Sequence, residues 1–487
     1  MTTSNVIRDP QGEAGRYLYE KIVDSLTQQI QVGSLKPGER LLSVRKLSKQ
    51  LDVSVSSVIQ AYIVLEAQGF VEARPQSGYY VRGAGGKVLL EPEMSNPVSA
   101  SVVVNVHDLV RDVIKTATDP SIIQLGAAVP CPSLIPATKL QRLHNEIIRK
   151  HGGDSLTYNF APGNYEFRRA MSQRALIWGC QLSADDIVLT NGAIEAVNLC
   201  LRAVAKPGDI IAVESPLFFG ILETIESLGM HVLELPTHPR NGVNVKALEA
   251  AIKQHRIQAC VFMPNFNNPL GCLMPTENKE MLVNLLARHE IPLIENDVHG
   301  DLHFAAKRPV PAKAFDKKGL VLYCTSFSKS LAPSFRVGWT APGRFRERVR
   351  SLKYMTSTAT PTLSQMVVAA FVQSGGYDKH LREVQRAFKS QVYQATQACQ
   401  NYFPKETKLS RPQGGHLMWV EFPSQVDSIK LHQDAFRHHG ISIAPGNLFS
   451  ASQKYKSAMR LNCGYPWSPQ LDQAIRIIGE LAHQQMV

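Results

Sequence analysis

Apolar positions near the start of the chain follow the repeat of a helix three times in succession. Residues 18–30 carry Leu or Ile at every fourth position, which places these side chains on one helical face. Residues 44–51 and 55–69 show a similar repeat, and each is preceded by a serine, Ser43 or Ser54, that can cap a helix. A short turn separates the second and third segments, so the pattern predicts a helix-turn-helix.

A strand-like pattern follows the third helix. The run FVEARPQSGYYVR, residues 70–82, predicts two short strands around a Pro-Gln-Ser-Gly turn. A helix, a helix-turn-helix and a hairpin in this order predict a winged helix that binds double-stranded DNA, although any small three-helix domain would show a similar spacing. The residues that we expect to contact DNA are Arg45, Ser54, Ser56, Ser57, Gln60 and Arg74.

The pattern changes beyond residue 82. Residues 83–105 hold a glycine cluster, two prolines and no helical period, which is typical of a linker. Beyond it, apolar runs such as DIVLT, DIIAVES and LVLYCTS alternate with helical stretches, which indicates a mostly parallel sheet covered by helices on both faces. We therefore predict an α/β chain with a DNA-binding domain at 1–82, a linker and lead-in at 83–120, and a large domain at 121–487.

Composition narrows the setting of the protein. Of its 487 residues, 44% are hydrophobic and 19% charged, which is ordinary for a folded chain of at least two domains. No apolar run reaches the length of a membrane span, and the N-terminus lacks the apolar core of a signal peptide, so we expect a soluble cytoplasmic protein. The net charge of +12 is spread evenly and does not by itself indicate DNA. The eight scattered cysteines predict reduced thiols and no metal site.

Reactive residue types gather at the predicted strand ends, where ligands bind in such sheets. The run TSFSKSLAPSFRVGW, residues 325–339, places Lys329 among serines and Arg336 seven residues later. A loop lysine is ordinarily a solvated cation, but burial would lower its proton affinity and leave a nucleophilic amine, as Schiff-base chemistry requires. Arg336 can clamp a phosphate, and Asn191-Gly192 opens a helix whose free amides can seat an anion. Each signal is weak alone, but together they fit pyridoxal phosphate (PLP).

Two stretches resemble known families. Residues 35–81 resemble the GntR-type winged helix, although Leu42 replaces the usual proline and Val55 stands where that family commonly has an arginine. Such an arginine would contact phosphate or guanine, so we expect the affinity for DNA or the choice of site to differ. Residues 121–487 resemble fold-type I aminotransferases, with a smaller C-terminal subdomain. In chain order, the matching runs are YNFAPGNYEFRRAM, TNGAIEAV, VESPLFFG, NFNNPLG, SFSKSLAPSFRVGW, APGNLF and MRLNC.

The aminotransferase resemblance implies which residues hold the cofactor and its ligand. Lys329 would form the internal aldimine, Asn268 would bond the phenolate oxygen of the ring, and Phe218 would stack on the ring. Arg460 would pair bidentately with a substrate carboxylate, and Tyr158 would reach the phosphate of the partner subunit, which implies a homodimer. The other phosphate ligands would be Gly192, Ala193, Ser326 and Arg336. Plain core packing for Phe218 and a turn hydroxyl for Ser326 are the alternatives.

The run IENDVHGDL departs from that family. Its members usually have an aspartate that pairs with the pyridinium nitrogen and, three residues later, a tyrosine that bonds the phenolate. Aligned without gaps, Asn296 and His299 take these positions. Asp297 is the alternative, and only one of the two neighbours can reach the ring because adjacent strand residues face opposite ways. If Asn296 faces the ring, its uncharged amide cannot hold the ring protonated, and the electron sink of transamination weakens.

The order of the two domains leads to a functional hypothesis. A GntR-type winged helix followed by an aminotransferase-like domain is the arrangement of MocR-type transcriptional regulators, which the whole chain resembles. We expect a homodimer that binds a double-stranded DNA operator and senses a small-molecule amine or amino acid through aldimine exchange at Lys329. The alternatives are an active aminotransferase with a vestigial DNA-binding module and a sensor of PLP itself, so whether the chain is an enzyme stays open.

Overall fold

The computed structural model divides the chain into two units. The small unit comprises the residues up to Val88 together with Tyr393–Asn401, and the large unit comprises Leu89–Val392 and Tyr402–Val487. The structure describes residues 18–31, 34–36, 38–67, 70–74, 77–81, 89–102, 104, 119 and 121–486.

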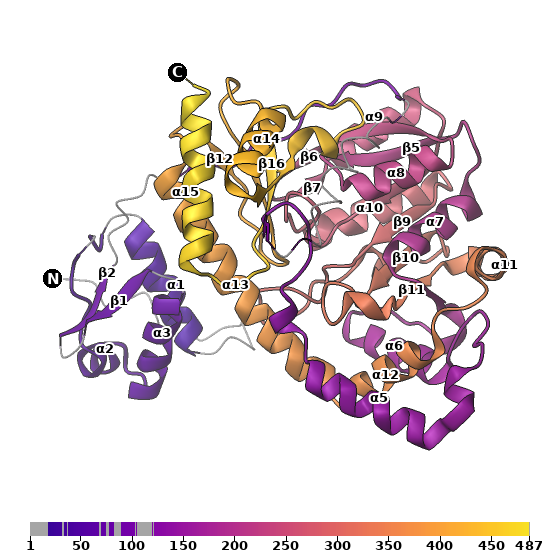
Figure 1. The fold of residues 1–487 in the computed structure, drawn as a ribbon, viewed down its shortest axis with the longest axis horizontal. Coiled ribbons are helices and arrows are strands. Elements are labelled where there is room, and N and C mark those ends of the chain that lie inside the picture. The colour runs from indigo at the N-terminus through magenta and orange to yellow at the C-terminus, as the bar shows by residue number, and fades with distance from the viewer. Residues whose placement is uncertain are drawn as a thin grey trace. The chain divides into compact units, whose positions relative to one another are not determined.

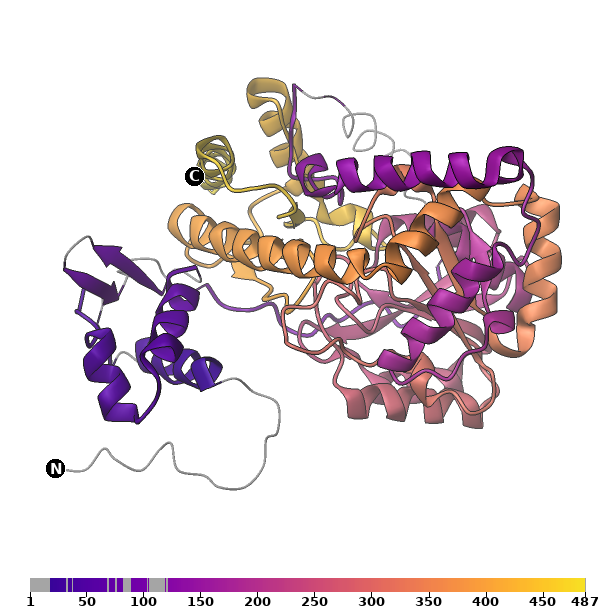
Figure 2. The same ribbon diagram turned by 90° about the horizontal axis from the view of Figure 1, so that it is seen from below.

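Three helices and a hairpin form the N-terminal part of the small unit. The elements are α1 (Leu18–Gln31), α2 (Val44–Leu51), α3 (Val55–Ala67), β1 (Val71–Arg74) and β2 (Gly78–Val81). The strands are antiparallel, with Val71 opposite Val81, and the hairpin lies beside the helices (Figure 2). The winged helix-turn-helix that the sequence predicts is therefore confirmed.

Side-chain caps and one apolar face explain why these helices form. Ser43 Oγ accepts a hydrogen bond from Lys46 N at 3.3 Å, and Ser54 Oγ accepts one from Ser57 N at 3.1 Å, so both predicted serine caps are present. The predicted inward face of α3, which carries Val58 and Tyr62, is at most 1% exposed. The Tyr62 hydroxyl donates to the Leu42 carbonyl at 2.6 Å and so ties α3 to the segment before α2.

An eight-stranded sheet is the centre of the large unit (Figure 1). Five neighbouring strands, β10, β9, β8, β5 and β6, are parallel, while β11 and β7 run antiparallel to their neighbours. The strands in sheet order are β4 (Val188–Thr190), β11 (Gly338–Ala341), β10 (Val321–Ser326), β9 (Leu293–Asn296), β8 (Ile257–Phe262), β5 (Ile210–Ser215), β6 (His231–His238) and β7 (Gly242–Val243).

Helices bury both faces of this sheet because successive strand residues point in opposite directions. Val261 packs into a core with α7 (Ala193–Val204), α8 (Phe219–Ser227) and α11 (Arg346–Ser357). The adjacent Phe262 belongs to a second core, with α9 (Val245–Gln254) and α10 (Thr276–Arg288). A third core unites the helices α5 (Ala137–His151), α6 (Tyr165–Ile177), α12 (Thr362–Gln373) and α13 (Gly376–Tyr402) with β4, β10 and β11.

The C-terminal residues form a smaller subdomain beside the main sheet (Figure 1). Its antiparallel sheet has the order β12 (Lys408–Leu409), β13 (Leu417–Glu421), β16 (Ala458–Asn462) and β15 (Ala444–Pro445). The helices α14 (Ser428–His439) and α15 (Pro469–Gln484) accompany it, and β14 (Ile441–Ser442) pairs with β3 (Ile123–Gln124). The predicted fold class, a winged helix joined to a fold-type I aminotransferase-like domain, is confirmed.

The segment 89–102 differs from the linker that the sequence predicts. Leu89 is 2% exposed, Val102 forms an antiparallel bridge with Val232, and Ser95 Oγ accepts a hydrogen bond from Thr237 N at 2.8 Å. Glu91 pairs with Arg240 at 2.6 Å. The segment therefore packs along the large unit, because its few apolar and polar side chains find partners there. Most of the predicted lead-in, residues 105–118, lies outside the described residues.

The state of the cysteines and the apolar character of the helices concern the chain as a whole. All eight cysteines are free, and seven of them are buried. Within the ranges described above, no helix combines the length and the apolar character that a membrane crossing requires.

Candidate functional site

The predicted cofactor residues follow the carboxyl ends of strands in the main sheet. Gly192 comes after β4, Phe218 after β5, Asn268 after β8 and Lys329 after β10, and Asn296 is the last residue of β9. These strands are parallel to one another, so their carboxyl ends reach the same edge of the sheet. The fold thus gathers at this edge residues that the sequence separates by more than a hundred positions.

Lys329 is held inside the large unit and is not a solvated surface cation. Its Nζ donates a hydrogen bond to the Ala128 carbonyl at 2.6 Å. Burial, and then the positive charges of Arg460 and Arg336, lower the pKa of Lys329 to about 8. Roughly a tenth of the amine is therefore unprotonated at pH 7, far more than for a lysine of ordinary pKa, and the unprotonated form is the nucleophile.

Arg460 is a buried arginine without a carboxylate partner among the described residues. It projects from β16, is 0% exposed, and donates from Nη1 to Asn268 Oδ1 at 3.0 Å and from Nη2 to the Gly126 carbonyl at 2.6 Å. Its Nε has no hydrogen-bond partner in the part of the chain that the structure describes. The ring of Phe449 lies 5.0 Å from the guanidinium. Burial lowers the pKa of Arg460 to about 9. A guanidinium so placed favours an incoming anion.

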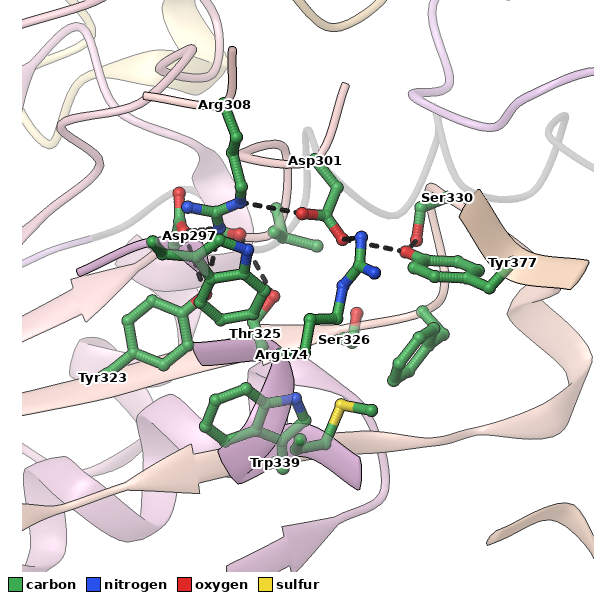
Figure 3. Close-up of a pocket in the computed structure, with 14 residues that line it drawn as sticks. Arg174, Asp297, Asp301, Arg308, Tyr323, Thr325, Ser326, Ser330, Trp339 and Tyr377 are labelled. Carbon is green, nitrogen blue, oxygen red and sulfur yellow. Dashed lines mark hydrogen bonds and ion pairs between the residues drawn. The ribbon is translucent and has the colours of Figure 1, made fainter. Parts of the chain in front are cut away.

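Gly192 and Arg336 meet at the first turn of α7, whereas Ser326 also lines a pocket beside a buried ion cluster (Figure 3). A Cβ on Gly192, whose φ is +87°, would lie 2.7 Å from Arg336 Nη2, so the guanidinium lies against this glycine. Ser326 pairs in register with Gly338, which itself packs on Gly192. Ala193 opens α7, and no side chain caps this helix. Uncapped helix amides beside an arginine are the kind of arrangement that favours an anion.

Phe218 and Tyr158 have different surroundings. A Cβ on Gly220 would contact both the Phe218 ring, at 2.7 Å, and Ile194 Cδ1, at 3.5 Å, so the ring lies beside the first turn of α7. Tyr158 is 73% exposed and stacks on Phe160, with 5.6 Å between ring centroids. Phe218 thus lies beside the start of α7, whereas Tyr158 lies on the surface of its own chain.

Asp297 is part of a buried ion cluster (Figure 3). It pairs with Arg308 Nη2, and its oxygens also accept hydrogen bonds from the Tyr323 hydroxyl and from Asn265 Nδ2, each at 2.9 Å. The preceding residue, Asn296, is 2% exposed, and its Oδ1 has no hydrogen-bond partner among the described residues. The two neighbours differ because successive strand residues face opposite ways.

His299 is a buried neutral imidazole. Its Nδ1 lies 3.0 Å from the Phe266 carbonyl, which can only accept, so Nδ1 carries the proton and Nε2 is left with a lone pair. No described residue bonds Nε2. Burial, and then the charge of Lys329, lower the pKa of His299 to about 4. The imidazole therefore offers an acceptor where the related family offers a tyrosine hydroxyl.

The structure adds His416, which the sequence analysis missed. This residue immediately precedes β13 and is 0% exposed. Its ring meets that of His299 edge to face, with 5.7 Å between the ring centroids. Burial, and then the neighbouring His299 and Lys329, lower its pKa well below the usual range. In the sequence, the pair of glycines before His416 in RPQGGHLMW was the feature that could have drawn attention to this residue.

Helix α13 fixes the residue next to Lys329, which no local pattern indicated. Tyr377 Oη lies 2.7 Å from Ser330 Oγ and donates to Asp301 Oδ2 at 3.0 Å, while His380 Nε2 lies 3.0 Å from the Ser330 carbonyl. Burial opposes the ionisation of Asp301, but Arg174 and Arg308 outweigh it and lower the pKa of Asp301 to about 2. The loop of Lys329 is thereby anchored in the ion cluster (Figure 3).

The predicted DNA contacts lie on three elements of the small unit. Arg45 of α2 and Gln60 of α3 are exposed, while Arg74 of the hairpin pairs with Glu72 at 2.7 Å and lies over the Tyr80 ring. At the start of α3, Ser54 Oγ lies 2.9 Å from Ser56 Oγ and 2.8 Å from Ser57 Oγ. The hydroxyls of Ser56 and Ser57 therefore both already lie within hydrogen-bond distance of Ser54.

Both units match known families. The model of aminotransferase class I and II matches residues 121–478, and that of the gntR family of bacterial regulatory proteins matches residues 18–81. The HTH-type transcriptional regulator YdcR of Escherichia coli (strain K12), described as uncharacterized, is 36% identical over 96% of this chain and 99% of its own length. The chain belongs to the MocR-type transcriptional regulators. A second such regulator, YjiR of the same strain, is 37% identical with the same coverage.

Solved structures agree with the fold of this MocR-type regulator. Kynurenine aminotransferase of Pyrococcus horikoshii, solved in complex with PMP, is 28% identical and superimposes with a TM-score of 0.73 over 78% of this chain and 95% of its own. The class I and II aminotransferase fold is a fold of PLP-dependent proteins, so the cofactor expected from the sequence is confirmed at the level of the family.

Proposed function

We propose that this MocR-type regulator binds double-stranded DNA through its small unit and senses an amine or amino acid at the PLP site of its large unit. One observation carries the proposal. Lys329, Arg460 and Arg336 converge on one sheet edge, and none of them pairs with a carboxylate among the described residues. Three cations gathered in this way favour an anionic cofactor and an anionic ligand.

The residues present fit PLP. Gly192, Ala193, Ser326 and Arg336 would hold its phosphate, because an uncapped helix start and a guanidinium meet there. Asn268 and Phe218 would border its ring, and Lys329 offers the amine to which it bonds. When bound, the cofactor supplies an aldehyde that condenses with one primary amine and can exchange it for another.

Arg460 would select ligands that carry a carboxylate. Its guanidinium has one unpaired nitrogen and is held in place by Asn268 and the Gly126 carbonyl. A carboxylate that reached it would be desolvated and hydrogen-bonded at once, which strengthens the interaction. An amino acid is therefore a better effector than the corresponding amine.

Asn296 and His299 favour sensing over turnover. The Asn296 amide is uncharged and the neutral His299 offers only an acceptor, so neither residue can stabilise a protonated cofactor ring as an aspartate would. A ligand could then bind covalently without efficient conversion. The second candidate, a working aminotransferase, draws support from Lys329 and Arg460, which that reaction would also need.

A second copy of the chain would complete the protein. Tyr158, Phe160 and Tyr354 expose 73%, 52% and 59% of their side chains, and the Phe160 ring lies 5.6 Å from that of Tyr158 and 6.0 Å from that of Tyr354. An exposed aromatic cluster of this kind is typical of a subunit interface. The homodimer would place two winged helices on two half-sites, and a DNA operator implies a cytoplasmic location.

The test combines cofactor trapping with DNA binding. Borohydride reduction should add the cofactor mass to the peptide of Lys329, and DNA enriched from a random pool should bind with an affinity that one or more of the twenty amino acids change. Lys329→Ala should abolish both effects, whereas Lys307→Ala, at an exposed lysine, should preserve them.

Other outcomes would contradict the proposal. DNA binding that ignores Lys329→Ala and every amine would remove the sensing function. Steady-state transamination at ordinary enzymatic rates would favour the aminotransferase. A change in DNA binding on addition of PLP alone would indicate a sensor of the cofactor itself.

A further inference from the structure

The exposed side of α3 is apolar. Val55, Ile59 and Ile63 expose 45%, 42% and 47% of their side chains. They stand four residues apart, so they lie on one face of the helix. The unit buries a different face, with Val58 and Leu65 at 0% exposure, so these three residues take no part in its core.

Few polar groups on α3 remain available for reading bases. The sequence SVSSVIQAYIVL, residues 54–65, contains no charged residue. Ser56 and Ser57 both lie within hydrogen-bond distance of Ser54, whose oxygen caps the helix. Gln60 is the exposed amide on this stretch.

The charges that complement DNA lie on neighbouring elements. Helix α2 exposes Arg45, Lys46 and Lys49, and the hairpin exposes Arg74. Cations of this kind bind phosphates and set the register of a protein on the duplex, but they carry no sequence information. The basic elements therefore supply affinity, and α3 is left to supply selectivity.

We infer that Val55 and Ile59 read the methyl groups of thymine in the major groove. The inference rests on the proposed DNA-binding function. The first turns of the second helix of a helix-turn-helix contact base edges, and Val55 and Ile59 occupy the first and second turns of α3. Thymine alone presents an apolar group in the major groove of B-DNA. Gln60, one position after Ile59, can bond the N6 and N7 of an adjacent adenine.

The experiment measures how much each thymine methyl group contributes to the affinity of the protein for DNA. The full-length, PLP-loaded protein is used to enrich sites from a random double-stranded pool, and each thymine of the enriched site is then replaced by deoxyuridine, which lacks only the methyl group. We expect one or two positions in each half-site to weaken binding about threefold to fivefold, as the loss of one buried methyl group predicts. Val55→Ser or Ile59→Ser should make the same positions insensitive to deoxyuridine.

Ile63→Ser is the matched control. Ile63 has the same side chain as Ile59 and a similar exposure, but it lies two turns into the helix. We expect its replacement to leave the deoxyuridine effects unchanged. A complementary gain is expected from Val55→Arg, which should move the preference at one position toward guanine.

Three results would overturn the inference in distinguishable ways. If an enriched site binds tightly but no deoxyuridine substitution matters, DNA binding stands and the reading of thymine fails. If no sequence is enriched, the DNA-binding function itself fails. Serine variants that alter self-association of the protein while leaving the enriched site unchanged would assign the apolar face to a protein contact instead.

Discussion

The two sides of the end of strand β9 differ in how their charges are paired. On one side Asp297 and Asp301 pair with Arg308 and Arg174, and each carboxylate also accepts a hydrogen bond from a tyrosine hydroxyl. On the other side Arg460 has no counter-ion among the described residues. Asn296 Oδ1 and His299 Nε2 also lack partners in that part of the chain.

This difference distinguishes residues that stabilise the fold from residues that are available to a ligand. Burying an unpaired charge or polar group costs free energy, which a bound ligand or an ordered water offsets by supplying the missing partner. On the paired side the carboxylates and guanidinium groups neutralise one another without a ligand, and this side anchors the Lys329 loop through Ser330. The unpaired side is the one where we place the cofactor and the effector.

The largest expected effect comes from breaking the paired side. Asp297→Ala should lower the free energy of unfolding by about 3–5 kcal/mol, because it leaves Arg308 buried with one carboxylate fewer. Asn296→Ala should cost less than about 1 kcal/mol, since its Oδ1 has no partner to lose. Urea unfolding of the cofactor-free protein measures both, and equal costs would erase the contrast between the two sides.

Arg460→Met should weaken ligand binding without weakening the fold. We expect the affinity for an amino acid to fall by one to two orders of magnitude, ~1.5–3 kcal/mol, since a charge-assisted bond is lost. Amino acids and their decarboxylated amines should then bind alike, as spectral titration of the PLP-loaded protein would show. Stability should change little, because the removal of a buried guanidinium without a counter-ion offsets the loss of its hydrogen bonds to Asn268 and Gly126. A variant that keeps the preference for amino acids would place the carboxylate elsewhere.

Acid should destabilise the large unit through the unpaired side. His299 in the unfolded chain takes up a proton near pH 6.5, whereas in the folded protein its pKa is lowered to about 4. Between these values the unfolded state binds more protons, so the free energy of unfolding falls as the pH falls, by ~2 kcal/mol from pH 6.5 to 5.

His299→Gln isolates this contribution, because His416 titrates in the same direction and remains in the variant. Urea unfolding at pH 7, 6 and 5 should give a shallower dependence on pH for His299→Gln than for the unmodified protein. Parallel curves would mean that His299 is not the group that resists protonation.

The smallest expected effect comes from the link between the two sides. Tyr377→Phe removes one hydroxyl that contacts both Ser330 and Asp301, and should cost ~1 kcal/mol of stability. Because Ser330 adjoins Lys329, the absorbance of bound PLP should shift or broaden as well. His380→Gln, which changes only the contact with the Ser330 carbonyl, provides a milder comparison. An unchanged spectrum in both variants would mean that α13 stabilises the fold without positioning Lys329.

Much of the fold could be predicted from short-range patterns. The inward positions of α3, the caps Ser43 and Ser54, and the alternation of apolar strands with helices all follow from local spacing. The segment 89–102 could not be predicted in this way. Its partners, such as Val232 and Arg240, lie more than a hundred residues away, so its own composition looks like that of a linker.

The two domains, their order and the motif that contains Lys329 and Arg336 could be predicted from the sequence alone, because these features depend on residues near one another in the chain. The neighbours of each polar group became known only from the three-dimensional structure. Asp297 pairs with Arg308, whereas Asn296 Oδ1 has no partner among the described residues. Ser330 contacts a helix that begins 46 residues later. Arg460 has no counter-ion within the described part of the chain. The physical reason is that pairing and desolvation depend on distances in space, which the order of residues along the chain does not give.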